Sequence, residues 1–258
     1  MGMRSRAVSR DRLYPLAYFG AVLRELMMFW RQRHTTLHVL IMQIFFTGVE
    51  AVATIALISL GIGAIIIVQG MAILPQFGAQ DVMYTLLILI ITRELGPLLT
   101  AFIVAARSGS AISTELGNMV VSHEVEAYVA VGINPVSYLA VPRVIGVTLS
   151  LLGLNIYFNI FGLVGSYGVV RLFQDLPLDE YVYNLATGLE LWDLLAPVLK
   201  SVAFGMIIGT VSTYYGFQVK RAITEVPQKT IKAIGSSIVL CIIANAVITA
   251  LSYTMRAG

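Results

Sequence analysis

Arg93 and Glu94 stand side by side inside an otherwise apolar stretch, 82–106, that is long enough to cross a bilayer. Ionised side chains are costly at that depth and mark substrate or ion pathways, so the two residues are the first candidates for function. A cation beside an anion suits a substrate with a charged headgroup better than a dry helix interface. The competing interpretation is a structural polar pair that satisfies neighbouring helices. Adjacent residues on a helix point about 100° apart, so the two side chains need not bond each other.

Three further residues, near this pair or near the membrane surface, are candidates for the same site. Pro97 has no N–H, so it leaves a backbone carbonyl without its donor and bends the helix, here around a cavity. Gln69 lies near the outer end of the first apolar stretch, where we expect it to line an exit. Glu50 is expected near the headgroups, where ionisation costs little. The predicted substrate-binding residues are therefore Arg93, Glu94, Gln69 and Pro97, with no catalytic or metal-ligating residue.

The composition excludes an ordinary soluble domain. Of the 258 residues, 58% are hydrophobic and only 12% are charged, and the mean hydropathy is +0.84. Soluble domains carry about 25% charged residues. Four more stretches reach the roughly 20-residue spanning length, so the chain is predicted to be an all-α integral membrane protein with five transmembrane helices. These stretches are 51–70, 144–170, 201–219 and 233–255.

Basic and acidic residues alternate from one loop to the next. Seven arginines precede His34, and the segment 218–232 holds four basic residues, whereas 71–81 and 172–193 have none. Because cytoplasmic loops are enriched in Lys and Arg, the N-terminus is predicted to be cytoplasmic and the C-terminus, after five crossings, periplasmic. This pattern also explains the net charge of +3 without a nucleic-acid partner.

The segment before the first span is predicted to include an interfacial helix. Residues 13–30 place apolar side chains at helical spacing among charged ones, which is typical of a helix lying on a membrane surface. The following residues 37–48 are apolar but short and are interpreted as the approach to the first span. Within the spans, Gly205 and Gly209 form a GxxxG pair that predicts close helix packing.

The polar segment 107–143, between the second and third spans, is predicted to form one or two short amphipathic helices on the cytoplasmic face. Ser110, Ser113 and Thr114 are candidate helix caps. The run Gly132-Ile133-Asn134-Pro135 is expected to end the helix. More than about 12–15 residues between elements are uncommon without a function, so an energy-coupling partner is the expected ligand of this segment.

Four blocks, in order and spacing, resemble the MlaE (YrbE) family of ABC-transporter permeases. The blocks are 93–101 (RELGPLLTA), 106–111 (ARSGSA), 115–119 (ELGNM) and 131–143 (VGINPVSYLAVPR). The chain departs from the family pattern at Ala106, where Gly is common, at Val120, where a basic residue is common, and at 122–124. The coupling surface is therefore expected to be less basic than in other members.

The resemblance implies a single permease domain over 1–258, with an N-terminal cytoplasmic and interfacial segment at 1–50 and a five-span region at 51–258. It implies a homodimer in a bacterial inner membrane that moves phospholipid or a related lipid. The partners would be two cytoplasmic ATPase subunits, a periplasmic MCE-domain protein and a small accessory subunit on the ATPase. Arg93 is then expected to engage a lipid phosphate at the dimer centre, while Glu94 positions it or moves with a gate. The expected ATPase-coupling residues are Glu115, Leu116, Met119, Glu124, Glu126 and Val129.

The chain lacks the motifs of an enzyme. It has no G-x-x-x-x-G-K-[ST] phosphate loop, no H-E-x-x-H zinc pair and no G-x-S-x-G elbow. No cofactor is therefore expected in this chain, and ATP and Mg are expected in the partner ATPase. Two alternatives stay open: an ion-coupled secondary transporter that uses Arg93 and Glu94, and a non-transporting membrane scaffold. No inverted pair of broken helices is visible in the sequence, which weakens the first of these.

Overall fold

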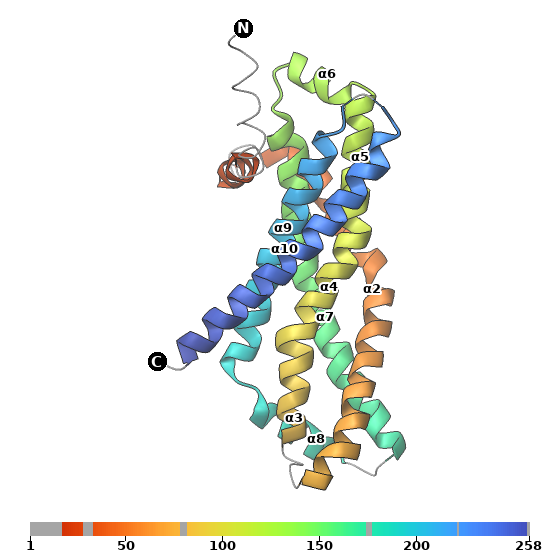
Figure 1. Ribbon diagram of the computed structural model, residues 1–258, viewed down its shortest axis with the longest axis vertical. Helices are drawn as coiled ribbons and strands as arrows, with labels where there is room; N and C mark the ends of the chain where they lie inside the picture. The colour runs from red at the N-terminus through yellow and green to blue at the C-terminus, as the bar shows by residue number, and fades with distance from the viewer. Residues whose placement is uncertain (1–16, 28–32, 78–81, 174–176, 221, 257–258) are drawn as a thin grey trace.

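The computed structural model describes residues 17–27, 33–77, 82–173, 177–220 and 222–256. Within these residues every regular element is helical and no strand occurs. Long helices run side by side along the long axis of the molecule (Figure 1). The predicted all-α fold is confirmed.

Five helical stretches are long and apolar enough to cross a membrane. Four of them consist mainly of one long helix each: α2 (Arg33–Ile73), α7 (Val141–Phe173), α9 (Leu191–Phe217) and α10 (Glu225–Arg256). The remaining one is a composite helix, Val82–Val121, in which α-helical and wider π-helical segments follow one another without a break. Its segments are α3 (Val82–Leu87), η3 (Ile88–Leu95), α4 (Gly96–Val104), η4 (Ala105–Gly109) and α5 (Ser110–Val121).

Short helices connect the spans at the two ends of the bundle. The helix α6 (Glu124–Ala130) follows α5 at the top of Figure 1, and the π-helical turn η5 (Val136–Ala140) leads from there into α7. At the other end lie the 3-10 turn η2 (Leu74–Phe77) and the helix α8 (Leu178–Gly188). The helix α8 was not predicted. It is amphipathic and buries Tyr181 and Leu185.

The first span begins earlier than the sequence predicted. Residues 37–48, interpreted as an approach to the membrane, are a continuous part of α2. They are apolar and contain no proline, so nothing in them ends a helix.

The predicted helix caps at Ser110, Ser113 and Thr114 are wrong. The helix runs without interruption through these positions. The Ser110 hydroxyl donates to carbonyl oxygens of its own helix, at 2.6 Å from Ala106 O and 2.7 Å from Arg107 O. Hydroxyls on a long helix bond back to the preceding turn in this way and then mark no helix start.

The predicted end of the helical segment before the third span is confirmed. His123 has φ of 60° and separates α5 from α6, and Gly132 has φ of 80° just after α6. A left-handed conformation costs glycine little, so Gly132 reverses the chain where a larger side chain would be strained.

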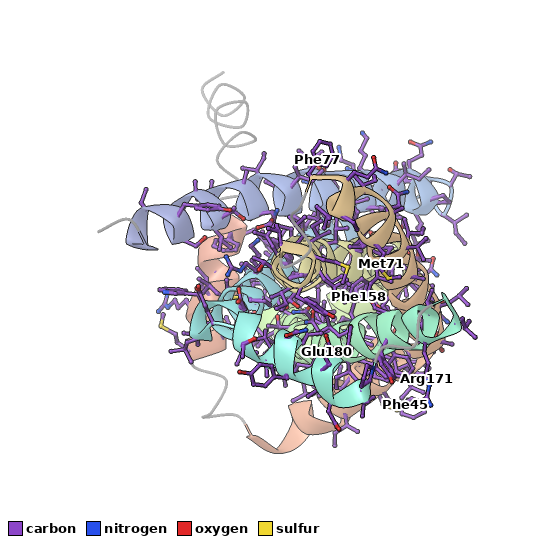
Figure 2. The ribbon with its side chains drawn as sticks, turned by 90° about the horizontal axis from the view of Figure 1, so that it is seen from below. Phe45, Met71, Phe77, Phe158, Arg171 and Glu180 are labelled. Carbon is purple, nitrogen blue, oxygen red and sulfur yellow. The ribbon has the colours of Figure 1, made fainter. Side chains whose placement is uncertain are left out.

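Small residues bring the helices into close contact. A Cβ atom at Gly205 would lie 2.5 Å from Thr148 Cα, and one at Gly209 would lie 2.7 Å from Val144 Cα. The GxxxG pair therefore packs α9 directly against the backbone of α7, as predicted. Seen along the bundle, Phe158 of α7 lies among the helices while Phe45 projects from the periphery (Figure 2).

The helix α10 crosses the bundle obliquely and leaves it toward the C-terminus (Figure 1). Of the most apolar part of this helix, only 11% is buried within the chain. Val239, Ile242, Ile243 and Val247 are exposed along it. An apolar exposed face is ordinary for a helix that crosses a bilayer, because lipid covers it.

Residues 17–27 form a helix beside α9, in agreement with the predicted interfacial helix; the remainder of 13–30 lies outside the described residues. The Tyr18 hydroxyl donates to Thr213 Oγ1 at 3.0 Å, and its ring contacts those of Tyr214 and Phe217. Burial raises the pKa of the Tyr18 hydroxyl, so this group stays neutral. Val22 is buried on the same helix.

Candidate functional site

Arg93 and Glu94 lie in η3, a π-helical segment of eight residues. Its wider turn ends where the Gly96 amide donates to the Ile91 carbonyl, five residues earlier. Gly96 suits this turn, because a Cβ atom there would lie 2.5 Å from the Ile91 carbonyl oxygen, and also 3.2 Å from Asn155 Oδ1 of α7. Such π-helical turns occur often at functional sites, since they redirect side chains that an α-helix would present elsewhere.

Pro97 creates a place for a cation. The residue is buried and lacks the N–H that would reach the Arg93 carbonyl, four residues earlier. The Lys200 ammonium from α9 donates to that carbonyl oxygen at 2.7 Å. A side chain from another span therefore bonds the carbonyl whose α-helical donor is missing at Pro97.

Lys200 also forms an ion pair with Glu94. Its Nζ lies 2.9 Å from Glu94 Oε2, and the Lys200 side chain is 1% exposed. From α10, Asn245 Nδ2 donates to Glu94 Oε2 at 3.0 Å and Thr249 Oγ1 donates to Glu94 Oε1 at 3.1 Å. One carboxylate thus ties the second span to the fourth and the fifth.

Arg93 pairs with acidic residues at the start of α9. Its Nε donates to Asp193 Oδ1, and its guanidinium lies 3.8 Å from Glu190 Oε2. The other oxygen of Asp193, Oδ2, accepts from the Glu190 amide at 2.8 Å as part of a capping box that starts the helix. Asp193 is fully buried, so it fixes the helix end and the guanidinium together.

The two neighbours point to different partners, as the helical geometry predicted. Arg93, Glu94, Asp193 and Lys200 form two cation–carboxylate pairs, and we call these four residues the charge network. Because the charges compensate one another, the cost of holding them in an apolar bundle is reduced.

Sequence reasoning missed Asp193 and Lys200. Asp193 was counted with the acidic outer loop, and the fourth span was started at Ser201, one residue after Lys200. The missed signal is the apolar run between them, interrupted by Pro197, which extends the span toward Leu191. Two charges seven residues apart on one helix also share a face.

The cavity at the charge network is small. Its volume is about 20 Å³, which is enough for one water molecule and too little for a lipid headgroup. A lipid headgroup therefore does not fit between these side chains unless the helices around the cavity move. The cavity is lined by Leu89, Arg93, Glu94, Ala196, Lys200, Ser252 and Tyr253.

Gln69 lies on a different cavity. It is exposed on α2 and lines a groove of about 270 Å³ together with Met83 and Leu86. Ile90, one turn before Arg93 on η3, lines the same groove. The described structure therefore brings Arg93, Glu94 and Pro97 together and leaves Gln69 apart from them, on an apolar groove that reaches the same helix.

The predicted coupling residues fall into a buried set and an exposed set. Leu116 is buried on α5, where a Cβ atom at Gly216 of α9 would lie 2.8 Å from the Leu116 Cβ; Met119 is partly buried. On α6 the three predicted residues are exposed: Glu124, Glu126 and Val129. Glu126 Oε2 lies 2.9 Å from His123 Nδ1. The exposed predicted residues at this end of the bundle therefore lie on α6, together with Glu115 of α5.

Glu115 connects α5 to the third span. Its Oε1 accepts from Arg143 NH2 at 2.7 Å, and Arg143 NH1 donates to the Leu139 carbonyl at 2.8 Å. Arg143 is buried with 5% of its side chain exposed, whereas 57% of the Glu115 side chain is exposed. Glu50, weighed as a weaker candidate, pairs with Arg107 at 3.1 Å and lies away from the charge network.

The comparisons with known proteins agree on one family. Residues 40–251 match the family model described as Permease MlaE. A probable ABC transporter permease protein of Rickettsia prowazekii is 31% identical over 219 residues, which cover 84% of each protein. A probable ABC transporter permease protein of Synechocystis is 31% identical over 207 residues, 79% of this chain and 77% of that protein.

A plant relative is also similar. The chloroplastic protein TRIGALACTOSYLDIACYLGLYCEROL 1 of Arabidopsis thaliana is 29% identical over 203 residues, 79% of this chain and 58% of that protein. The family match covers all five spans of the described structure almost completely. On these grounds the chain belongs to the MlaE permease family.

Proposed function

We propose that this chain is the membrane subunit of an ATP-driven ABC transporter that moves a phospholipid or a related lipid across or out of the membrane. The single observation that carries the proposal is the charge network, which places an arginine and a lysine inside a bundle of five apolar helices. A substrate with an anionic headgroup and apolar chains fits such a bundle, because the cations meet the phosphate and the helices meet the chains.

The name of the Arabidopsis relative, which contains that of a glycerolipid, supports a lipid as cargo. The groove at Gln69 supports the same cargo, since it is lined mainly by apolar side chains and has a volume of about 270 Å³. It ends at Ile90, about one turn from Arg93. In this proposal the phosphate displaces Asp193 from the Arg93 guanidinium when the helices part. Glu94 stays with Lys200 and holds α10 to the site.

The composite helix gives the proposal a route for coupling. The charge network and α5 belong to one unbroken helix, 82–121, whose 40 residues extend about 60 Å. A partner that moves α5 and α6 would move η3 as well, because a helix transmits displacement along its axis. The π-helical segments η3 and η4 are the places where this helix would bend.

The remaining parts of the proposal follow from the family. ATP and Mg belong to a separate ATPase that contacts the α6 surface and Met119. The chain works as a homodimer in a bacterial inner membrane, with the α6 end in the cytoplasm. An MCE-domain protein receives or delivers the lipid at the periplasmic end, and an accessory subunit binds the ATPase.

Affinity purification of the tagged chain from its native membrane in mild detergent tests the assembly. The proposal expects an ATPase with a phosphate-loop motif and an MCE-domain protein among the co-purified chains. Purified complex in liposomes should then move fluorescent phospholipid only with ATP, and Arg93→Ala should abolish this transport while the complex stays assembled. Full transport by an assembled Arg93→Ala complex would contradict the proposed role of Arg93.

An ion-coupled transporter is the second candidate, and one observation favours it. The charge network is electrically compensated around a cavity of about one water molecule, which suits a proton or a small ion. This candidate predicts transport by the chain alone in liposomes with an ion gradient. Transport that requires ATP and the ATPase would exclude it.

A further inference from the structure

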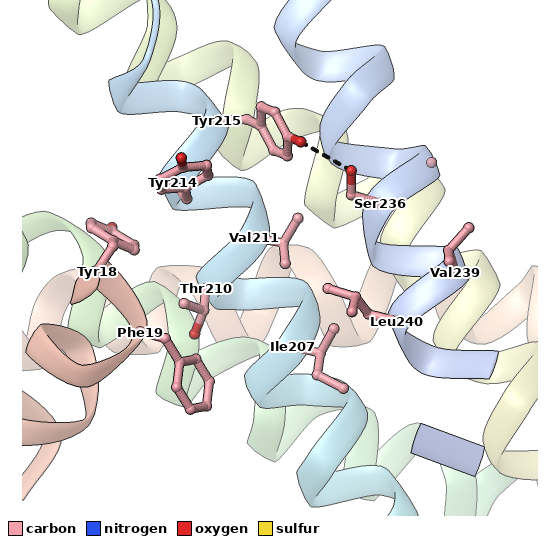
Figure 3. Close-up of a pocket in the computed structure, with 11 residues that line it drawn as sticks. Tyr18, Phe19, Ile207, Thr210, Val211, Tyr214, Tyr215, Ser236, Val239 and Leu240 are labelled. Atoms are coloured by element: carbon pink, nitrogen blue, oxygen red, sulfur yellow. Dashed lines mark hydrogen bonds between the residues drawn. The ribbon is translucent and has the colours of Figure 1, made fainter. Parts of the chain in front are cut away.

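A second, larger cavity lies between the helix 17–27, α9 and α10 (Figure 3). Its volume is about 720 Å³, inside the roughly 300–1,000 Å³ range of small-molecule sites. Its wall on α9 runs from Ile207 to Tyr215, which is about 12 Å along the helix axis. It shares no residue with the cavity at the charge network.

The lining changes from polar to apolar along the helices. Toward the α5–α6 end, Tyr215 and Ser236 place hydroxyl groups at the cavity, 3.1 Å from each other. Further down, Ile207, Leu240 and Phe19 present apolar side chains (Figure 3). A ligand that fits this lining has a polar end toward α5–α6 and an apolar end toward the middle of the spans.

Thr210 lies between these two zones on α9. The residue is only 4% exposed, and its hydroxyl oxygen has no hydrogen-bond partner among the described residues. A buried hydroxyl without a partner is costly, and a ligand with a carbonyl oxygen at this depth would satisfy it.

A basic residue, Lys232, lies on α10 just before the polar end of the cavity. Lys232 precedes Ser236 by one turn of α10, so the two residues share a face of that helix. The Lys232 side chain is exposed. From Lys232 to Leu240 the face of α10 therefore presents a cation, then a hydroxyl, then apolar side chains. This order is complementary to an anionic phospholipid, whose phosphate, ester groups and acyl chains follow one another.

We propose that this cavity binds one acyl chain of an anionic membrane phospholipid from the leaflet at the α5–α6 end. The chain lies against Ile207 and Leu240, an ester carbonyl accepts from Thr210, and the phosphate lies near Lys232. The lipid is a bound component that holds the helix 17–27 against α9. It is distinct from transported lipid, and the proposal does not depend on what the charge network carries.

Gly235 supplies the variant that tests the site. It lines the cavity, and a Cβ atom there would have no atom within 4 Å, so Gly235→Leu fills the space without meeting the backbone. Gly153 of α7 is equally open and lies outside the cavity, which makes Gly153→Leu the matched control. Both substitutions add the same side chain to a membrane-spanning helix.

The measurement is photolabelling of the full chain, purified with its co-purifying partners and placed in phosphatidylcholine liposomes. The probe is phosphatidylglycerol with a photoactivatable group on one acyl chain, and labelled peptides are identified by mass spectrometry. We expect label on α9 between Ile207 and Tyr215, lost in Gly235→Leu and kept in Gly153→Leu. Thr210→Val should weaken the labelling. Lys232→Gln should lower the preference over a phosphatidylcholine probe by about fivefold, the value of one basic residue near anionic headgroups.

Two results would overturn the proposal. Labelling of α9 that is equal in wild type, Gly235→Leu and Gly153→Leu would show only general exposure to lipid. Absence of label on α9 in the assembled wild type would show that a second copy of this chain or a partner fills the cavity. If Gly235→Leu does not assemble, the Thr210→Val and Lys232→Gln comparisons decide, because both residues tolerate these changes without added volume.

Discussion

The helix 82–121 carries cation–carboxylate pairs at η3 and at η4, and these pairs differ in how exposed their side chains are. At the charge network, the side chains of Lys200 and Asp193 are 1% and 0% exposed, and those of their partners Glu94 and Arg93 are 32% and 18% exposed. Near the α5 end, Arg107 and Glu50 have side chains that are 45% and 47% exposed. The geometric contacts are similar, with a distance of 2.9 Å between Lys200 and Glu94 and 3.1 Å between Arg107 and Glu50.

Arg143 and Glu115 are intermediate between these extremes, because only the arginine is buried. An exposed ion pair contributes little to stability, since water already solvates both partners. A buried pair contributes little as a whole as well, but losing one member leaves an uncompensated charge. The comparison therefore predicts that single substitutions rank by burial, and the following four variants test that ranking.

The largest effect is expected for Lys200→Met. This change removes the cation that pairs with Glu94 and the ammonium that donates to the Arg93 carbonyl, and it should lower the free energy of unfolding by about 3 kcal/mol. Denaturation with sodium dodecyl sulfate, followed by circular dichroism, measures the loss. Lys220→Met, at an exposed lysine after the end of α9, is the control. Equal stability of the two variants would refute the ranking, and Glu94→Gln added to Lys200→Met should restore part of the loss.

Asp193→Asn should have the next largest effect. Asparagine keeps the shape but removes the charge that faces Arg93, and it weakens the capping box at the start of α9. A hydrogen bond to a charged group contributes roughly 1.5–3 kcal/mol, so a loss of about 2 kcal/mol is expected. The same denaturation assay should show almost no change for Glu190→Gln, because 60% of that side chain is exposed. A larger effect at Glu190 would mean that the exposed carboxylate is the true partner of Arg93.

Arg143→Met should have a moderate effect on stability. Methionine keeps the packing of the aliphatic chain, while Glu115 turns to solvent and the Leu139 carbonyl loses a donor. We expect a loss of about 1 kcal/mol. If α5 transmits motion to the third span through this pair, ATP-dependent transport should fall more than tenfold in a folded complex. Transport in proportion to the remaining folded protein would limit Arg143 to a structural role.

The smallest effect is expected for Arg107→Gln, which breaks the pair with Glu50. Both side chains are about half exposed, so the loss should stay below about 0.5 kcal/mol. Added salt should abolish even this difference, because exposed charges are screened. The check is the denaturation midpoint of wild type and variant at low and high sodium chloride concentration. A loss that persists at high salt would show that the pair is buried in the assembled protein.

Much of the fold follows from local properties of the sequence. Each of the five apolar stretches overlaps an observed membrane-length helix, because length and hydropathy are properties of one segment, and only 201–219 runs past the end of its helix, at Phe217. The end of α6 was predicted at Gly132 for the same reason, since a left-handed residue acts within one turn. The caps at Ser110, Ser113 and Thr114 are wrong predictions, because a hydroxyl that could cap a helix start can also lie inside a helix, where Ser110 bonds back to its own helix and Thr114 bonds Thr230 of α10.

The candidate site was predicted in part. Arg93 and Glu94 were predicted because a charged residue within an apolar stretch can be recognised from the sequence alone. Lys200 escaped because it stands at the edge of its segment, where a charge is ordinary. Nothing local indicates that the Lys200 ammonium bonds the Arg93 carbonyl, or that Glu94 bonds Asn245 and Thr249.

The sequence by itself determined that this is a five-span helical membrane protein of the MlaE type, with charges inside its second span. The tertiary structure alone decided which charges pair, that the cavity between them is water-sized, and that a larger cavity with a polar and an apolar end lies beside the helix 17–27. The physical reason is how far apart in the sequence the interacting residues are. Hydropathy and backbone conformation depend on neighbours along the chain, whereas ion pairing and cavities depend on side chains that only the packed helices bring within a few ångströms of one another.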